Sequence, residues 1–306
     1  MNLLRSELVR FTSRRAVVLL LVVGFVLALV ATGATLWNNR PITDDERAEG
    51  AAMAAQQVED CRATPRAYGY RDPDRCEELS QFVSANRYPS PFNNVADELS
   101  LGIMGILAFT ALLAGTTYVG AEFASGALSN TLLFRPNRWQ VWVAKVVAVA
   151  VWTTAFAAVA IGVCLLAVAL VAETRSGGDP SQAQVLKLAG RGLRVLVVVV
   201  AGAVLGAALT TALRATIATT GIVIGYLLVG ETLLRAVAAT TVEPWLLSVR
   251  VLAFVQPGVR LETYSGNFTE PTVRIITFWS SATYLGILSL ALLLACAAVF
   301  HRRDVP

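Results

Sequence analysis

The hydrophobic positions of this chain are gathered in long uninterrupted runs. A helix needs about 20 apolar residues to cross the hydrocarbon core of a bilayer. Five uncharged runs reach roughly that length, and a sixth does so by including two charged residues near its end. We therefore predict six transmembrane helices, over residues 16–37, 99–121, 146–171, 195–213, 215–239 and 275–300.

The composition agrees with this pattern. Of the 306 residues, 56% are hydrophobic and only 15% are charged, whereas soluble domains carry roughly 25% charged residues. The expected fold class is therefore an all-α integral membrane protein with six transmembrane helices and small polar segments between them.

The polar residues before the first run predict an additional helix over residues 1–15. Leu4, Leu8 and Phe11 follow the spacing i, i+4 and i+7, and arginines occupy the other faces. A basic amphipathic helix of this kind is suited to the membrane surface, where its cations lie near anionic lipid headgroups.

The distribution of positive charge predicts the orientation, because Lys and Arg collect on the cytoplasmic side of a membrane. With six spans, both termini lie on one side, together with the loop 122–145 and the tail 301–306. That side holds most of the cations near the helix ends: Arg5, Arg10, Arg14, Arg15, Arg135, Arg138, Lys145, Arg214, Arg302 and Arg303. Both termini are therefore predicted to be cytoplasmic. The net charge of +4 reflects this sidedness, and we expect no nucleic-acid partner.

The segment 38–98 lies on the opposite, extracytoplasmic side and is acidic overall. It contains Cys61 and Cys76, which can form a disulfide in an oxidising compartment. Such a bridge closes a loop of about 15 residues and contributes roughly 3 kcal/mol in the chain-entropy model. The alternative is two free thiols.

Three further features are predicted on the extracytoplasmic side. Residues 240–274 include an apolar piece between two prolines that is too short to cross, so we expect a re-entrant or interfacial pair of half-helices. Glu231 and Arg235 are spaced i, i+4 near the end of the fifth span. They form either an intrahelical ion pair, with Arg235 reaching the interface, or the polar lip of a substrate exit path. Lys187, Arg191 and Arg194 precede the fourth span, where they lie at headgroup level or meet acids of segment 38–98.

The motifs of common catalytic sites do not occur in the sequence. It contains no GxxxxGK[ST] phosphate-binding loop, no HExxH and no GxSxG, and its only histidine is His301. We therefore predict no catalytic residues, no metal site and no cofactor bound by this chain.

The loop between the second and third spans has an ordered pattern of charges, glycine and proline. An acid (Glu122) is followed by Ser125 and Gly126, then by apolar side chains and a proline turn with basic residues; the later positions are Leu128, Leu132, Leu133, Arg135, Pro136, Arg138 and Lys145. This pattern resembles the corresponding loop of ABC-2 type transporter permeases. Ala127, Asn137 and Ala144 depart from the usual residues of that loop, but none of the three removes a charge or the proline.

The resemblance extends to the predicted topology, including the amphipathic helix that precedes the first span. The outer segment resembles permeases of the bacitracin-resistance and sodium-efflux type. This implies a permease subunit in a bacterial plasma membrane, paired with a second permease chain that is either identical or paralogous, and with membrane lipids around it. Two separate ATP-binding subunits would bind ATP and magnesium and dock on the cytoplasmic loop 122–145, whose pattern residues would couple them to transport.

The expected function is therefore the transmembrane part of an ATP-driven exporter of an amphiphile such as a drug, peptide or lipid. The alternative is a membrane anchor or sensor that does not transport and whose segment 38–98 binds a ligand. The two differ in whether an ATP-binding subunit accompanies the chain.

Overall fold

The computed structural model describes residues 3–38, 43–65, 76–77, 92–175, 182–256, 258–263 and 272–302. Within these ranges six helices are long and apolar enough to cross a membrane, which confirms the predicted all-α membrane fold. They are α2 (Arg15–Asn38), α5 (Phe92–Ala124), α7 (Arg138–Arg175), α8 (Gln182–Leu213), the joined helix of α9 (Thr216–Gly225), η3 (Tyr226–Gly230) and α10 (Glu231–Val242), and α12 (Phe278–Arg302).

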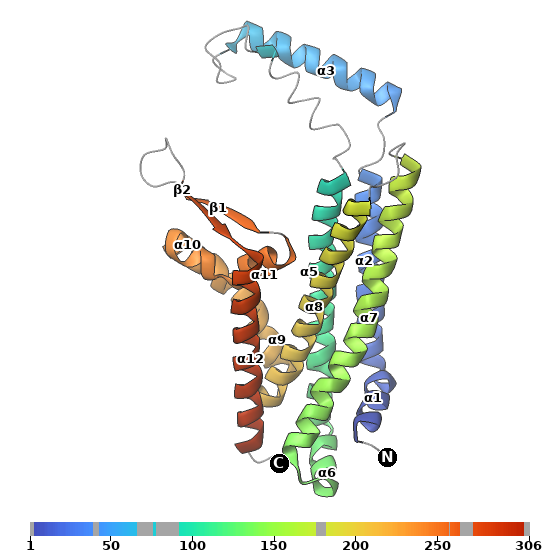
Figure 1. Ribbon diagram of the computed structural model, residues 1–306, viewed down its shortest axis with the longest axis vertical. Coiled ribbons are helices and arrows are strands. Elements are labelled where there is room, and N and C mark those ends of the chain that lie inside the picture. Colours follow the sequence, from blue (N-terminus) through green and yellow to red (C-terminus); the bar gives the residue numbers. More distant parts are fainter. Residues whose placement is uncertain are drawn as a thin grey trace.

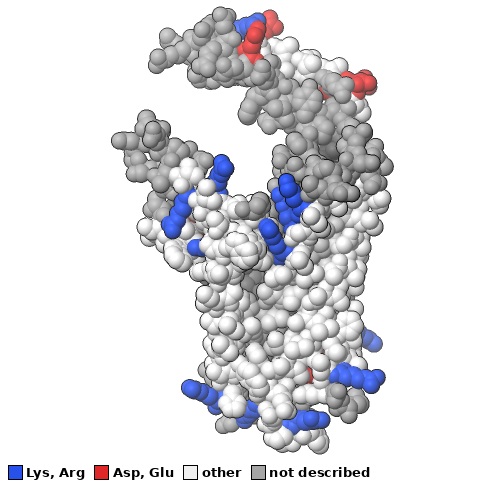
Figure 2. All heavy atoms as spheres, viewed as in Figure 1, with Lys and Arg blue, Asp and Glu red and all other residues white. Residues whose placement is uncertain are grey.

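The start of α1 (Leu3–Ser13) and the end of α12 lie at one end of the bundle, and α6 (Ala127–Phe134) lies there too (Figure 1). We call this the termini end. A two-stranded β-hairpin lies at the other end, which we call the hairpin end. Figure 2 shows Lys and Arg side chains gathered at both ends, with an uncharged surface between them. This distribution is the one expected where the middle of the bundle contacts lipid and the ends contact headgroups.

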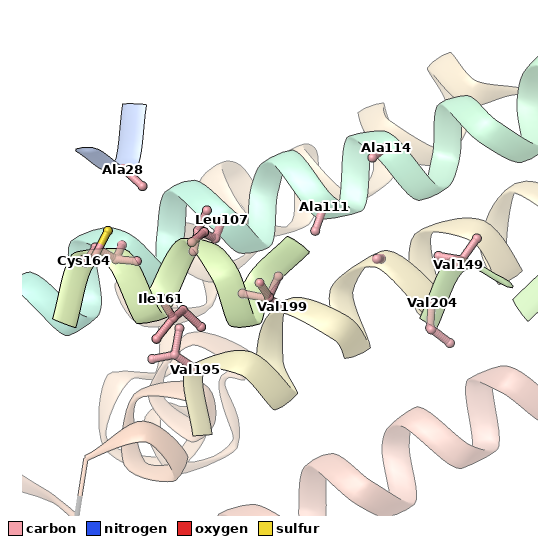
Figure 3. Close-up of a cluster of buried hydrophobic side chains, with 14 of the residues drawn as sticks. Ala28, Leu107, Ala111, Ala114, Val149, Ile161, Cys164, Val195, Val199 and Val204 are labelled. Atoms are coloured by element: carbon pink, nitrogen blue, oxygen red, sulfur yellow. The ribbon is translucent and has the colours of Figure 1, made fainter. Parts of the chain in front are cut away.

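The core of the bundle is formed by α2, α5, α7 and α8. Figure 3 shows buried side chains from all four helices, among them Ala28, Leu107, Ile161 and Val199. The contact between α5 and α8 is the most extensive one in the described chain, and it depends on glycine. A Cβ atom added to Gly206 would lie 2.9 Å from the Leu112 carbonyl oxygen. Small residues of this kind let the backbones of membrane helices approach closely.

The segment between α2 and α5 contains the helix α3 (Asp44–Ala63). Its first turn is fixed by a capping box, in which Thr43 and Glu46 each bind the other's backbone N–H. Its last turn carries Cys61, which forms a disulfide with Cys76, and Arg62 forms an ion pair with Glu77. Residues 92–98 form the first turns of α5, and residues 39–42, 66–75 and 78–91 of the predicted segment 38–98, like most of the tail 301–306, lie outside the described residues.

Several helices extend beyond the predicted spans. Helix α7 begins at Arg138, so the last eight residues of the predicted loop 122–145 are helical. Helix α8 begins at Gln182, which places Lys187, Arg191 and Arg194 within the helix before its uncharged run. The run of apolar residues locates the part of a helix that crosses lipid, but polar residues continue the same backbone hydrogen bonding beyond it.

The prediction of paired half-helices over residues 240–274 was wrong in its second part. After η4 (Glu243–Trp245) and the short helix α11 (Leu247–Val255), the chain forms the strands β1 (Val259–Thr263) and β2 (Thr272–Ile276). The strands pair antiparallel, with Val259 opposite Ile276 and Thr263 opposite Thr272. Both strands are rich in β-branched side chains, which favour this conformation.

Candidate functional site

The termini end carries the residues of the predicted coupling loop, now divided between a turn, a short helix and the start of α7. Gly126 ends the turn after α5 with a φ of 66°, a conformation that glycine adopts without steric cost. Helix α6 then ends at Phe134, because Arg135 precedes a proline and takes an extended conformation (φ −137°, ψ 86°). The chain re-enters helix at Arg138.

Helix α6 presents two different apolar faces. Leu128 is fully buried, and Leu132 packs with it against Val141, Trp142 and Phe300. Leu133 and Phe134 point outward and are 80% and 85% exposed. The paired leucines of the sequence pattern therefore have separate roles: one holds α6 against the bundle, and the other contributes to an exposed apolar tip. We call Leu133 and Phe134 the α6 tip.

Behind α6, four side chains from α1, α5 and α7 form a buried ionic cluster: Glu7, Tyr118, Glu122 and Lys145. The Lys145 Nζ donates to Glu7 Oε2 at 2.8 Å and also contacts Glu122 Oε2. The Tyr118 hydroxyl donates to the same Glu7 oxygen at 2.5 Å. All four residues are at most 2% exposed.

Two partly exposed arginines lie beside the buried carboxylates of the cluster. The Arg10 Nη1 lies 3.2 Å from Glu7 Oε1, and the Arg14 Nη2 lies 3.5 Å from Glu122 Oε1. Arg14 and Lys145 also lie near the face of the Tyr118 ring, each 5.7 Å from its centroid. Two carboxylates thus face three cations, so each buried negative charge has a positive neighbour, as the low dielectric requires.

The cluster fixes helix α1 to the bundle, and further contacts reinforce it. The Trp152 Nε1 of α7 donates to the Leu8 carbonyl oxygen at 3.0 Å, and the rings of Phe11 and Tyr118 lie 5.1 Å apart. The Arg10 guanidinium also donates to the Thr131 hydroxyl of α6 at 3.3 Å. Helix α1 is therefore linked at the same place to α5, α6 and α7.

The predicted coupling residues divide into a buried group and an exposed group. Glu122 and Lys145 are buried inside the cluster and pair with each other. Lys145 also pairs with Glu7 of α1, and Glu122 lies next to Arg14, which directly follows α1. The opposite charges offset the cost of burying each one. Gly126, Arg135 and Pro136 are exposed beside the α6 tip. Arg138 is half-buried and donates to the His301 carbonyl oxygen at 3.3 Å.

Sequence reasoning missed Glu7 and Tyr118. The predicted apolar face of the first helix was Leu4, Leu8 and Phe11, but Leu4 is exposed, and the buried residues are Glu7 and Phe11. Glu7 is the only acid in this basic helix, and it lies four residues before Phe11 on the same face. The signal available in the sequence was a single acid on the same helix face as a buried aromatic residue.

A shallow groove of about 480 Å³ adjoins this site, between α1 and the beginning of α7. Its lining is mostly apolar, with Arg135 at one edge: Leu3, Leu4, Arg135, Trp139, Gln140, Val143, Ala144 and Val147. Arg135, at the edge of the groove, directly follows the α6 tip in the chain.

Glu231 and Arg235, at the hairpin end, do not form the predicted ion pair with one another. The Glu231 Oε1 accepts a hydrogen bond from the Ser248 backbone N–H at 2.9 Å, and the Arg235 Nη2 donates to the Ser248 hydroxyl at 3.0 Å. Ser248 lies in the first turn of α11, where backbone N–H groups have no helical acceptor. The buried Glu231 thus stabilises the start of α11.

These observations define a polytopic helical membrane protein whose N-terminal helix is held against the bundle by a buried ionic cluster. A family model described as "Protein of unknown function (DUF2705)" matches residues 79–306, and the chain belongs to this family. The match includes Tyr118, Glu122, Lys145 and the α6 tip, whereas Glu7 lies before it. No curated protein and no solved structure gives a match.

Proposed function

We propose that this chain is the transmembrane permease subunit of an ATP-driven ABC exporter. In this proposal a separate ATP-binding subunit hydrolyses ATP, and the chain couples that hydrolysis to outward movement of an amphiphilic substrate. In this proposal the ATP-binding subunit, and not this chain, supplies the catalytic residues. The proposal is supported by the resemblance of loop 122–145 to ABC-2 permeases and by the geometry of that loop.

The observation that carries the proposal is the exposure of the α6 tip. Helix α6 extends further along the bundle at the termini end than α1 or α12 does (Figure 1). Leu133 and Phe134 lie on its outer side, next to the exposed Arg135. Exposed apolar side chains gathered in this way, with a cation beside them, are typical of a protein interaction surface. A groove on an ATP-binding subunit fits such a tip.

The contacts behind α6 transmit a movement of the docked partner to the other helices of the bundle. A partner that moves α6 acts on Leu128 and Leu132, which pack against α7 and α12, and on Thr131, which binds Arg10 of α1. The buried ionic cluster then links α1 to α5 and α7. Displacement of one short helix is in this way communicated to three longer ones, as an exporter that alternates between two states requires.

The proposed function also specifies the side of the membrane that the termini end faces and the proteins that bind this chain. The termini end faces the cytoplasm of a bacterial cell, since α6 must meet an ATP-binding subunit there. Two such subunits, each with bound ATP and magnesium, serve a pair of permease chains. The second permease is either another copy of this chain or a paralogue.

Co-purification of an ATP-binding subunit tests the proposal. The tagged chain is co-expressed with the ATP-binding subunit encoded nearest to it, and both are extracted in mild detergent. We expect a complex with ATPase activity. The double substitution Leu133→Asp and Phe134→Asp places two charges in the proposed contact and is expected to weaken the complex by at least about tenfold, since hot-spot residues each contribute about 2 kcal/mol or more.

The matched control is Leu186→Asp, which changes a leucine of α8 that is also 77% exposed but lies toward the hairpin end. This variant should retain the complex and its ATPase activity. If no ATP-binding subunit co-purifies with the unchanged chain, or if the double variant binds as well as the control does, the proposal is wrong. The anchor or sensor function would then be the better account.

A further inference from the structure

The β-hairpin is positioned at the boundary of the transmembrane region by contacts at its base. Strand β2 ends at Ile276, two residues before α12 begins at Phe278. The Arg194 guanidinium of α8 lies 4.4 Å from the centroid of the Phe278 ring and donates to the Val255 carbonyl oxygen at 3.4 Å. Since the uncharged run of α8 begins at residue 195, the base of the hairpin lies at the level where that run begins.

One face of the hairpin packs against α11, and the other face is uncovered. Val259, Leu261 and Ile276 pack on buried residues of α11. Val273 and Ile275 alternate with these positions and are exposed, Ile275 by 60%. Arg260 lies directly opposite Ile275 in the strand register. Glu262 lies opposite Val273 in the same register, so the positions of the uncovered face are two branched apolar residues, one cation and one acid.

Trp279 extends this face, and a second exposed tryptophan, Trp245, packs beside Tyr284 of α12. Trp279 follows the hairpin in the first turn of α12 and is 76% exposed, and Trp245 precedes α11 and is also exposed. Trp279 lies on the same stripe of α12 as the exposed Ile287, Leu290 and Leu294, at spacings of i+8, i+11 and i+15. An apolar stripe on a transmembrane helix faces lipid, so its continuation at Trp279 does as well.

We propose that the uncovered face of the hairpin, together with Trp245 and Trp279, binds the lipid leaflet at the hairpin end. The tryptophan rings lie at the membrane–water interface, where such rings are enriched. Val273 and Ile275 enter the interfacial region, and Arg260, which is exposed and lies opposite Ile275, binds a phosphate group of a phospholipid. The hairpin thereby holds α11 and the start of α12 at a fixed depth.

Continuity favours lipid over a protein partner. The face continues directly into the lipid-facing stripe of α12 through Trp279. The acidic helix α3 and a second copy of the chain are the other candidates for this face. Either of them would cover the apolar side chains with protein. The experiment below distinguishes such coverage from contact with lipid.

Fluorescence quenching in lipid nanodiscs tests the proposal. A cysteine replaces Ile275 and is labelled with an environment-sensitive dye; the native Cys164 and Cys296 are buried, and Cys61 and Cys76 form a disulfide. The control is Met53→Cys, at an exposed position of α3. Phospholipids with a nitroxide on the headgroup should quench the dye at 275 and not the dye at 53. Aqueous iodide should do the reverse. Iodide quenching at 275 as strong as at 53, or protection of 275 from both quenchers, would overturn the proposal.

The role of Arg260 is tested in the same nanodiscs. We expect nitroxide-labelled phosphatidylglycerol to quench the dye at 275 more than nitroxide-labelled phosphatidylcholine does. Arg260→Gln should reduce that preference by at least about threefold, because a cation near an anionic surface contributes about 1 kcal/mol. Lys187→Gln, at the same end of the bundle, should leave the preference unchanged. No preference in the unchanged chain, or an undiminished one in Arg260→Gln, contradicts the binding of a headgroup phosphate by Arg260.

Discussion

Replacement of Lys145 by methionine is expected to destabilise the protein by about 3–5 kcal/mol, the usual cost of removing one partner from a buried ion pair. Lys145 lies between two buried carboxylates, those of Glu7 and Glu122. Methionine fills a similar volume but leaves both acids without their shared cation and facing one another. The midpoint of thermal unfolding in detergent should fall by about 5–15 °C, and α1 should become susceptible to proteolysis.

The control for this substitution is Lys187→Met, which changes the chain's other lysine at an exposed position. Its unfolding midpoint should remain near that of the unchanged protein. The triple variant Glu7→Gln, Glu122→Gln and Lys145→Met removes the two negative charges as well, and it should recover most of the lost stability. A triple variant no more stable than Lys145→Met would mean that charge burial is not what holds α1.

Replacement of Gly115 by valine is expected to prevent normal packing of α5 on α8. A Cβ atom on Gly115 would meet the Ala203 carbonyl oxygen well inside van der Waals contact. Because that atom belongs to the backbone, no side-chain rotation can relieve the clash, and the two helices must separate. We expect a loss of about 3 kcal/mol or more. The variant should aggregate or elute as a broad peak in size-exclusion chromatography.

Gly105→Val is the matched control, because Gly105 lies on the same helix and an added Cβ there would meet no atom within 4 Å. This variant should elute like the unchanged protein. If both variants aggregate or elute as broad peaks, valine in α5 disturbs the helix itself, and the close approach to α8 is not the cause. If both elute like the unchanged protein, the close approach does not exclude a larger side chain.

The sequence predicted the spans well for a simple physical reason. Burial in lipid demands apolar side chains over a fixed length, and that demand is visible in any run such as residues 146–171. The sequence predicted much less about which sides of the helices meet. The exposed Val151 and the buried Val149 of α7 are the same residue type, since lipid and a protein core both accept an apolar side chain.

For the candidate site, too, the sequence predicted some features and not others. A short helix with paired leucines between Gly126 and Pro136 could be predicted, because glycine and proline limit the backbone conformation near helix ends. The pairing of Lys145 with Glu7 could not, since it joins residues 138 positions apart. The hairpin was missed because its strands are short and the apolar residues around them had been assigned to half-helices.

The buried ionic cluster and the α6 tip have different consequences for experiments on coupling. A substitution such as Glu122→Ala disturbs the cluster and with it the position of α1. Its effect on ATPase activity would therefore not report on docking alone. Substitutions at Leu133 and Phe134 change side chains that are almost fully exposed, so their effects can be attributed to a partner.

The central claim, that the α6 tip contacts an ATP-binding subunit, is tested most directly by site-specific photocrosslinking in intact cells. A photoreactive phenylalanine analogue replaces Phe134 in the tagged chain, and the same analogue at Met53 of α3 serves as the control. We predict a crosslinked product from position 134 that contains a protein with a GxxxxGK[ST] phosphate-binding loop, and none of that product from position 53. A crosslink from position 134 only to lipid, or only to proteins without that motif, would contradict the proposed function.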